Sequence, residues 1–461
     1  MSMSAEQKHR WMTGTPIPRL VTSLAIPTTV SQLITIIYNT ADTYFVSHIS
    51  TSASAAVGVA FALQAIIQAL GFGVSMGCSS VVSRKLGSED LESAQTYASS
   101  AIAAAIAMGF ILLAGGLSFL KPLMRLLGST DTILPYACDY TRIILIGAPV
   151  MCTSFILSAI LKSEGEARLS MIGLTSGGIV NIALDPLFIF AFKMGISGAA
   201  LATVISQGVS LVILASMFRG SRSIIKPDAK KISKKFSVYW DLFRIGFPTI
   251  CRQGLASVSS ALLNHGAAAW GGAYPDAAVA AVTISNKIYM LVRSVIIGIG
   301  QGFQPVAGYN YGAGLYKRVK KAFWFATAAG TALCLVCAVS IGFSAPVVMR
   351  WFRNDDKVVE IGAVALRFAC AVMPLLAYST FVNQLYQCLG FSVPATILAS
   401  CRQGIFFIPI ILIVPRLIGL TGVQLTQPAA DLLTCLVSIP FHIVFFKRVL
   451  DRPPEPRVSM E

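Results

Sequence analysis

The chain alternates between long apolar runs and short polar segments for almost its whole length. An α-helix needs roughly 20 consecutive apolar residues to cross the hydrocarbon core of a membrane, and each run reaches about this length. The pattern therefore predicts an all-α polytopic membrane protein with twelve transmembrane helices. We place the helices near residues 20–46, 54–82, 94–118, 136–160, 168–191, 196–218, 240–269, 276–309, 319–344, 361–387, 396–414 and 422–446.

Charged residues are scarce, and most of them lie between the apolar runs. They make up 12% of the 461 residues, against 55% hydrophobic residues, whereas soluble domains have roughly 25% charged residues. Alternate connecting segments hold 23 Lys and Arg residues on one side of the predicted membrane and 7 on the other. The positive-inside rule therefore predicts a multi-pass protein of the cell inner (plasma) membrane with both termini in the cytoplasm. The net charge of +16 is then a topology signal and not a sign of nucleic-acid binding.

A long basic segment at residues 219–239 divides the predicted helices into two groups of six. Gly73 and Gly87 match Gly298 and Gly312 at an offset of 225 residues. Parallel repeats are typical of transporters with a substrate path between two lobes, so we predict two pseudo-symmetric six-helix lobes around a central cleft. A duplicated scaffold without a transport role is the alternative. The predicted organisation is a cytoplasmic N-terminal segment at 1–19, an N-terminal lobe at 20–218, a basic cytoplasmic linker at 219–239, a C-terminal lobe at 240–446 and a cytoplasmic tail at 447–461.

Two polar residues four positions apart, Asn181 and Asp185, interrupt the apolar run of the fifth predicted helix. At this spacing both side chains project from one face of a helix. A carboxylate inside a membrane is costly unless it has a partner, and such residues usually mark an ion or proton pathway. Pro186 follows directly and is expected to loosen the helix and to free a backbone carbonyl nearby.

A second carboxylate and a hydroxyl are expected at a similar depth. At about 1.5 Å per residue from the cytoplasmic edge, Asp42 lies roughly 35 Å along the first helix and Asp185 roughly 26 Å along the fifth. Thr203 reaches a similar depth from the outer side. Asp42, Asn181, Asp185 and Thr203 therefore form a predicted cation or proton coupling site. Hard oxygen ligands suit Na⁺, and two close carboxylates can instead share a proton. Helix packing is the alternative role for the two aspartates.

Other polar and cationic residues within the predicted helices are candidates for a substrate cleft that accepts amphipathic molecules. Hydrogen bonding between helices is the alternative role for each of them. The candidates are Gln32, Tyr38, Asn39, Gln64, Gln68, Gln207, Arg252, Gln253, Met290, Gln304 and Arg402. Lys287 and Arg293 are further cations in the C-terminal lobe, and Asp431 is a potential partner for one of the cations there.

The sequence lacks the motifs of an ATP-driven pump and of an enzyme. No Gly-x4-Gly-Lys-Ser/Thr loop is present, so transport has to draw on an ion gradient. No nucleophile triad, HExxH motif or paired acid and base occurs, so we expect no enzyme activity and no cofactor. We also expect no metal beyond Na⁺ at the coupling site. Cys334 and Cys337 have CxxC spacing inside an apolar run without a His, which favours packing over metal or redox chemistry.

Several motifs together resemble the bacterial multidrug type of the multidrug and toxic compound extrusion (MATE) family. This family belongs to the multidrug/oligosaccharidyl-lipid/polysaccharide flippase superfamily. The resemblance extends from about Pro16 to Arg448. Its motifs are Asp42-Thr-Tyr-Phe-Val, Gly73-Phe-Gly-Val, Ser83-Arg-Lys-Leu-Gly-Ser-Glu-Asp90, Lys162-Ser-Glu-Gly-Glu-Ala-Arg168, Asn181-Ile-Ala-Leu-Asp-Pro186, Gly195-Ile-Ser-Gly-Ala-Ala-Leu-Ala-Thr-Val-Ile-Ser-Gln207 and Gln301-Gly-Phe-Gln-Pro-Val-Ala-Gly-Tyr-Asn-Tyr-Gly-Ala313. Ser47 departs from the family pattern, which usually has Gly there.

The resemblance implies two lobes that alternate between outward and inward opening. It implies secondary active efflux of amphipathic, often cationic, drugs or metabolites in exchange for inward H⁺ or Na⁺. It also implies that the coupling residues are Asp42, Asn181, Asp185 and Thr203. In such members cation binding is thought to bend the first helix, and Pro27 is suitably placed for a bend. We expect small-molecule substrates, contact with membrane lipids, no nucleic-acid partner and a monomer.

Two other function classes are alternatives. A lipid-linked precursor flippase of the same superfamily would favour a cationic cleft, and Arg252, Lys287, Arg293 and Arg402 supply positive charge. A membrane-embedded scaffold or receptor would perform no transport. The acidic cluster argues against this last class, because a scaffold has no need of buried carboxylates.

Overall fold

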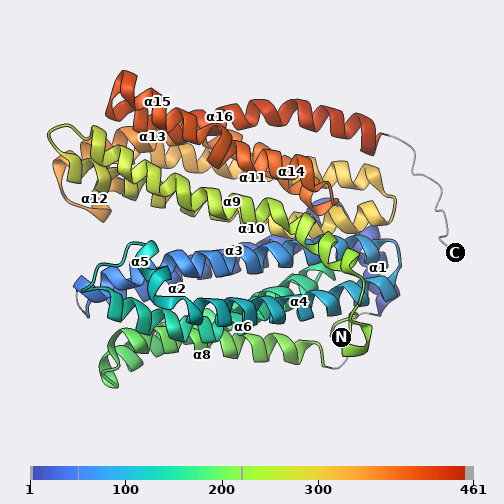
Figure 1. Ribbon diagram of the computed structural model, residues 1–461. Coiled ribbons are helices and arrows are strands. Elements are labelled where there is room, and N and C mark those ends of the chain that lie inside the picture. Colours follow the sequence, from blue (N-terminus) through green and yellow to red (C-terminus); the bar gives the residue numbers. More distant parts are fainter. Residues whose placement is uncertain (1–3, 50, 220–221, 452–461) are drawn as a thin grey trace.

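A computed structural model of the chain describes residues 4–49, 51–219 and 222–451. Within these residues the secondary structure is entirely helical, and no β-strand occurs. The helices lie side by side in two bundles, which Figure 1 shows one above the other. The predicted all-α class and two-lobe architecture are confirmed.

The first bundle, the N-lobe, is built from six long helices. They are α2 (Ile17–Ser47), α3 (Thr51–Gly87), α4 (Leu91–Ser118), α6 (Leu134–Ser163), α7 (Ala167–Pro186) and α8 (Gly195–Met217). A short π-helical segment, η1 (Leu187–Ala191), continues α7 beyond Pro186. Each helix begins or ends within a few residues of the position that the apolar pattern predicts.

The second bundle, the C-lobe, repeats this arrangement. Its helices are α9 (Phe236–Trp270), α10 (Pro275–Gly312), α11 (Tyr316–Phe343), α13 (Asp356–Cys388), α14 (Ser392–Ser400), α15 (Phe407–Ile418) and α16 (Leu420–Phe445). The π-helical segment η3 (Cys401–Ile405) joins α14 to α15, so the three together form one membrane span. A further π-helical segment, η4 (Phe446–Leu450), ends the described chain. Most of the predicted tail, residues 452–461, lies outside the described residues.

The apolar pattern did not predict three short helices. They are α1 (Ala5–Gly14), α5 (Leu120–Leu126) and α12 (Ala345–Phe352). Each is at most ten residues long, which is too short to cross a membrane. A single 3₁₀ turn, η2 (Ala229–Lys231), lies in the linker between the lobes.

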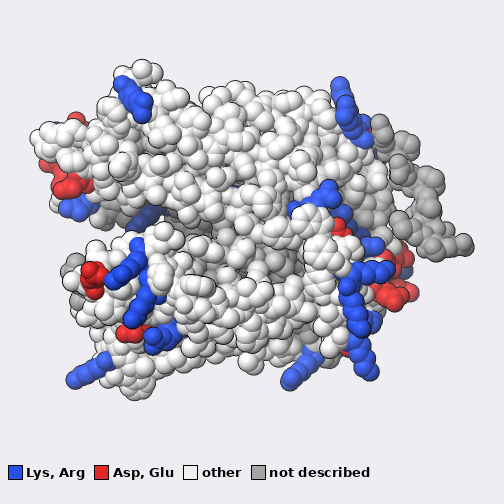
Figure 2. Space-filling view, in the orientation of Figure 1, with Lys and Arg blue, Asp and Glu red and all other residues white. Residues whose placement is uncertain are grey.

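Eleven spans in the described chain are long and apolar enough to cross a membrane. The twelfth, α9, has 35 residues, and Asp241, Arg244 and Arg252 lower its hydropathy. Figure 2 shows most charged side chains gathered at the two ends of the molecule, with a broad uncharged band between them. This distribution fits a molecule whose middle lies in hydrocarbon.

The two lobes contact each other near the end that holds α1 and the linker, which we call the linker end. There the hydroxyl of Thr28 on α2 donates to the carbonyl of Gly298 on α10, at 2.7 Å. One turn further along α10, a side-chain carbon at Gly302 would lie only 2.4 Å from the backbone nitrogen of Ala25. Only glycine permits such a close approach of two helix backbones. The glycines of α10 therefore allow the lobes to close at the linker end.

At the opposite end, which holds α5 and α12, the lobes are separated. Figure 2 shows a hollow between them there. Among the described residues, the hydrogen bonds that join α2, α3 and α6 to the C-lobe all involve the halves of these helices nearest the linker. The cleft between the lobes thus opens at the α5–α12 end.

A buried carboxylate ties α1 and the linker to the N-lobe. Glu164 follows α6, is 1% exposed, and accepts hydrogen bonds from the hydroxyl of Ser223 at 2.6 Å and the backbone N–H of Ile225 at 3.0 Å. The buried ammonium of Lys8 on α1 lies 3.3 Å from it. Farther along the chain, Arg318 of the C-lobe donates to the carbonyl that follows α1, at Thr15. The N-terminal segment therefore joins the two lobes at the linker end.

Replacing Glu164 with alanine is expected to destabilise the folded protein by about 3–5 kcal/mol, because it removes one partner of a buried ion pair. Burial raises the pKa of Glu164, and the Lys8 ammonium and the hydrogen bonds from Ser223 and the linker backbone oppose that rise. The measurement is the thermal midpoint of the purified protein in detergent. Glu166→Ala is the matched control, since Glu166 also contacts Lys8, at 3.1 Å, but is 27% exposed. A loss of about 1 kcal/mol or less is expected there. Equal losses of stability in the two variants would contradict the role of Glu164 as the stabilising buried partner of Lys8.

Candidate functional site

The four predicted coupling residues meet inside the N-lobe. Asp42 comes from α2, Asn181 and Asp185 from α7, and Thr203 from α8. All four side chains are buried, with exposures of 4%, 3%, 0% and 7% in that order. The four-residue spacing of Asn181 and Asp185 places both on one face of α7, as predicted.

Several oxygen atoms of this cluster have no hydrogen-bond partner. The amide of Asn181 donates to Asp185 Oδ1 at 3.2 Å and to Thr203 Oγ1 at 3.5 Å. Within the described residues, Asp42 Oδ1, Asp185 Oδ2 and Asn181 Oδ1 are buried and without a partner. The two carboxylates are close enough to interact electrostatically. Buried acceptors in this number favour a proton or a hard cation, because either would satisfy oxygens that the protein leaves unpaired.

The helix changes its form directly after Asp185. Pro186 lacks a backbone N–H, and the next five residues form the π-helical segment η1. π-Helical turns inside α-helices frequently lie at functional sites. The expected loosening of the helix at Pro186 is thus present as a local widening of the turn.

Tyr140 on α6 is a member of this region that the sequence reasoning missed. Its side chain is fully buried, and its hydroxyl has no partner of hydrogen-bonding geometry among the described residues. The hydroxyl lies within electrostatic range of both Asp42 and Asp185. Tyr140 lies six residues from the start of α6 at the α5–α12 end, which corresponds to about 9 Å of depth. Tyr140 therefore lies at about the depth expected for Thr203, and residue counting along α6 predicts it as a member of the cluster.

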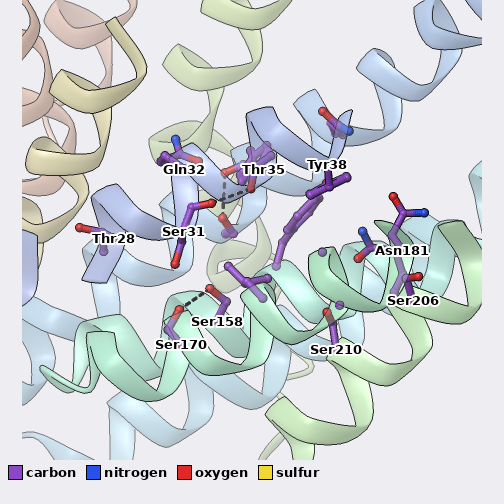
Figure 3. A pocket seen from close by; sticks show the side chains of 18 of the residues that line it. Thr28, Ser31, Gln32, Thr35, Tyr38, Ser158, Ser170, Asn181, Ser206 and Ser210 are labelled. Carbon is purple, nitrogen blue, oxygen red and sulfur yellow. Dashed lines mark hydrogen bonds between the residues drawn. The ribbon is translucent and has the colours of Figure 1, made fainter. Parts of the chain in front are cut away.

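A polar cavity adjoins the cluster and extends through the N-lobe towards the linker end. Figure 3 shows its lining from α2, α6, α7 and α8, with Asn181 at one wall and a hydrogen-bonded pair, Ser158 and Ser170, at 2.7 Å. Asn181 and Thr203 belong both to the cluster and to the cavity. Four predicted cleft residues also line it: Gln32, Tyr38, Gln68 and Gln207. At its far end Lys162 donates to Gln301 of α10 at 3.3 Å, which closes the cavity against the C-lobe.

The other predicted cleft residues do not line this cavity. Gln64 and Gln304 are buried inside the protein, with exposures of 5% and 4%. Asn39 and Gln253 are partly buried and lie apart from it. The remaining three, Arg252, Met290 and Arg402, belong to the C-lobe.

A buried charged cluster lies at the corresponding place in the C-lobe. Arg402 Nε donates to Asp431 Oδ1 at 2.5 Å, so Asp431 does pair with one of the cations. Tyr289 joins them: its hydroxyl donates to Asp431 and accepts from Arg402 at 2.7 Å. Gln427 donates to the same carboxylate at 3.0 Å. Asp431 is therefore fully engaged, unlike the two N-lobe aspartates.

Comparison with known proteins decides the family. A sequence model described as MatE matches the chain twice, at residues 27–187 and 253–413. The chain belongs to the MatE family. The two matched segments fall one in each lobe, which agrees with the internal repeat.

Relatives of this MatE chain include a named exporter. This chain is 26% identical over 440 residues to the multidrug export protein MepA of Staphylococcus aureus (strain bovine RF122 / ET3-1). The alignment covers 95% of this chain and 96% of the relative. A crystal structure described as MATE in the straight conformation matches with a TM-score of 0.89 at 25% identity, covering 95% of this chain and 98% of that one. A second structure, a MOP superfamily transporter from Pyrococcus furiosus for which a reversed polarity of the binding pocket is described, also gives 0.89 at 25% identity, covering 96% and 99%. The predicted family, a multidrug transporter of the MATE type, is confirmed.

Proposed function

We propose that this MatE protein is a secondary active multidrug efflux transporter. It exchanges amphipathic or cationic drugs and metabolites for inward H⁺ or Na⁺ by alternating access. The observation that carries the proposal is the buried pair Asp42 and Asp185 beside a polar cavity, each with a carboxylate oxygen that lacks a hydrogen-bond partner among the described residues. The export function of the MepA relative supports the same direction of transport.

The wall that the coupling cluster and the cavity share links cation binding to substrate binding. Asn181 and Thr203 face both the carboxylates and the cavity, and Tyr38 of the cavity wall is within electrostatic range of Asp42. A cation between the carboxylates would neutralise two buried negative charges and would draw the Asn181 and Thr203 oxygens towards it. That shift reshapes the wall that contacts the substrate, so cation and substrate binding become linked.

Helix α2 is the element best placed to transmit this change. It carries Asp42 near one end and passes through Pro27 without interruption. Thr28, the next residue, makes the hydrogen bond to Gly298 across the lobe interface. A helix is most easily bent at proline, because a backbone hydrogen bond is missing there. Bending at Pro27 would link occupancy of the cation site to contact between the lobes.

The basic linker end is proposed to face the cytoplasm, with both termini inside and the protein a monomer in the inner membrane. The positive-inside rule supports this orientation. In this orientation the linker end, where the lobes touch, faces the cytoplasm, and the separated α5–α12 end faces the outside. In this state the coupling ion reaches the cation site from outside, and H⁺ or Na⁺ enters along its gradient from that side.

The proposal is tested by efflux of a fluorescent amphipathic cation, rhodamine 6G, from proteoliposomes with an imposed pH or Na⁺ gradient. We expect dye transport with one of the two gradients and only passive leak with neither. The gradient that drives transport identifies the coupling ion. Dye transport that is independent of both gradients would contradict ion coupling.

The C-lobe cations favour a second candidate, a flippase for lipid-linked precursors. Arg252, Arg293 and Arg402 provide charge that a diphosphate headgroup would match. A flippase would move a fluorescent lipid diphosphate between leaflets in the same liposomes and would not transport the dye. Movement of the lipid diphosphate without dye transport would show that the protein is a flippase and not a drug antiporter.

A further inference from the structure

The two lobes enclose polar interiors of opposite charge at equivalent places. In the N-lobe, neither Asp42 nor Asp185 forms an ion pair within the described residues, and the cation that lines the adjoining cavity, Lys162, lies at its far end. In the C-lobe, three guanidinium groups, from Arg252, Arg293 and Arg402, accompany a single carboxylate. The C-lobe cluster therefore carries an excess of about two positive charges.

The internal repeat relates the two interiors residue by residue. At the offset of 225 that links Gly73 to Gly298, Gln68 corresponds to Arg293. Gln68 lines the N-lobe cavity, and Arg293 lines a smaller pocket between α9, α10, η3, α15 and α16. At the offset of 224 that links Gly195 to Gly419 and Gly198 to Gly422, Gln207 corresponds to Asp431. Two uncharged residues of the N-lobe cavity, Gln68 and Gln207, thus have charged residues at the equivalent positions of the C-lobe.

Arg293 is the group that this arrangement leaves unsatisfied. Its side chain is 9% exposed, and it has neither a hydrogen bond nor an ion pair in the described part of the chain. It is within electrostatic range of Arg402 and Arg252, both of like charge. Asp431 is also within electrostatic range of Arg293, but it already pairs with Arg402 and offsets only one of the three guanidinium charges. A buried cation among like charges is costly unless an anion accompanies it.

The pocket beside Arg293 has further groups that suit an amphipathic anion. Gln403 and Gln427 supply amide groups, and Ser259 supplies a hydroxyl that is already donated to the carbonyl of Gln403. Phe407 and Met290 supply apolar surface at the same pocket, and Met290 is 46% exposed. A guanidinium with adjacent amides and apolar walls is the chemistry that recognises a carboxylate or phosphate on an apolar body.

We propose that the C-lobe pocket at Arg293 binds an anionic group of the exported amphiphile, so that substrates with a carboxylate or phosphate are preferred. This inference rests on the proposed efflux function, whose substrate class it narrows. The shared ligand chemistry is an anionic oxygen group, which an anionic lipid headgroup also carries. The substrate is the favoured source because the pocket is the repeat equivalent of the N-lobe cavity.

The test compares two dyes that differ in one group, rhodamine 19, which has a free carboxylic acid, and rhodamine 6G, its ethyl ester. Their affinities for the full chain in phosphatidylcholine nanodiscs are measured by fluorescence anisotropy. We expect the acid to bind about tenfold more tightly than the ester, as a charge-assisted hydrogen bond would give. Arg293→Gln, which copies Gln68, is expected to bring this ratio to about one. Arg293→Met, which removes the charge and keeps an unbranched side chain, is a second variant should the first fail to fold.

Lys287→Gln is the matched control. It removes a positive charge from the same helix, but its side chain is exposed, so the wild-type ratio is expected. A wild-type ratio near one, or an unchanged ratio in folded Arg293→Gln or Arg293→Met, would overturn the proposal. Nanodiscs that contain phosphatidylglycerol distinguish the lipid source: loss of the acid preference there would assign the pocket to lipid and overturn the substrate assignment. Gradient-driven transport of both dyes without acid preference would reject this inference alone, whereas absence of any gradient-driven transport would reject the proposed function.

Discussion

Asp185→Asn and Asp42→Asn are each expected to reduce gradient-driven dye efflux to the leak rate of protein-free liposomes. Asparagine has nearly the same shape as aspartate, so the packing of α2 and α7 is preserved while the negative charge is lost. With one carboxylate left, the site can neither balance a cation as before nor share a proton between two acids. The measurement is the initial rate of rhodamine 6G efflux under the gradient that drives the wild type.

The control for this pair is Asp139→Asn on α6. Asp139 precedes Tyr140 but is exposed, so its replacement removes a carboxylate of the same lobe without altering the cluster. We expect the wild-type rate in this variant. Full transport by both single cluster variants would eliminate the coupling role of the aspartates. Binding of the dye by the inactive variants would show that they are folded.

Gly302→Ala is expected to stop transport by a different route, with the coupling site intact. The new methyl carbon would lie 2.4 Å from the backbone nitrogen of Ala25, so α2 and α10 must move apart. Overpacking of this kind costs about 1–3 kcal/mol, which corresponds to a shift of roughly 5- to 150-fold between two conformations. Because the strain exists only where the lobes touch, it penalises the state that is closed at the linker end. Distances between spin labels across that end are expected to increase.

Gly115→Ala on α4 is the corresponding control. A side-chain carbon built there meets nothing within 4 Å, so the variant is expected to transport at the wild-type rate. Wild-type transport and an unchanged label distance in Gly302→Ala would show that the lobes do not need this close contact. Reduced transport in both variants would point to a general effect of alanine in the helices.

Much of the fold could be predicted from the sequence because membrane helices have a strong, local signal. Each span is a run of apolar residues that is bounded by charges. In the described chain eleven of the twelve predicted spans coincide with helices long and apolar enough to cross a membrane, and the twelfth coincides with α9. The short helices α1, α5 and α12 lack this signal, since their stability comes from contacts. Lys8 on α1, for example, is held by Glu164, which lies 156 residues away in the chain.

The candidate site was predictable in part for the same reason. Depth along a helix follows from residue counting, so Asp42, Asp185 and Thr203 could be placed at one level before the structure was known. Rotation about the helix axis and tilt do not follow from counting. They determine that Gln68 faces the cavity while Gln64, four residues earlier, is buried without lining it. They also determine that Asp431 meets Arg402 and not Arg293.

The central claim is that the cluster of Asp42, Asn181, Asp185 and Thr203 binds the ion that is exchanged for substrate. It is tested most directly by cation movement that substrate itself drives. Proteoliposomes are loaded with rhodamine 6G, with equal pH and Na⁺ on both sides, and cation uptake is followed with a pH-sensitive dye or ²²Na⁺. We predict that outward dye flow drives H⁺ or Na⁺ into the liposomes, and that this uptake is absent in the Asp42→Asn and Asp185→Asn variants. Dye efflux without uptake of either cation in the wild type, or unchanged uptake in both variants, would contradict the claim.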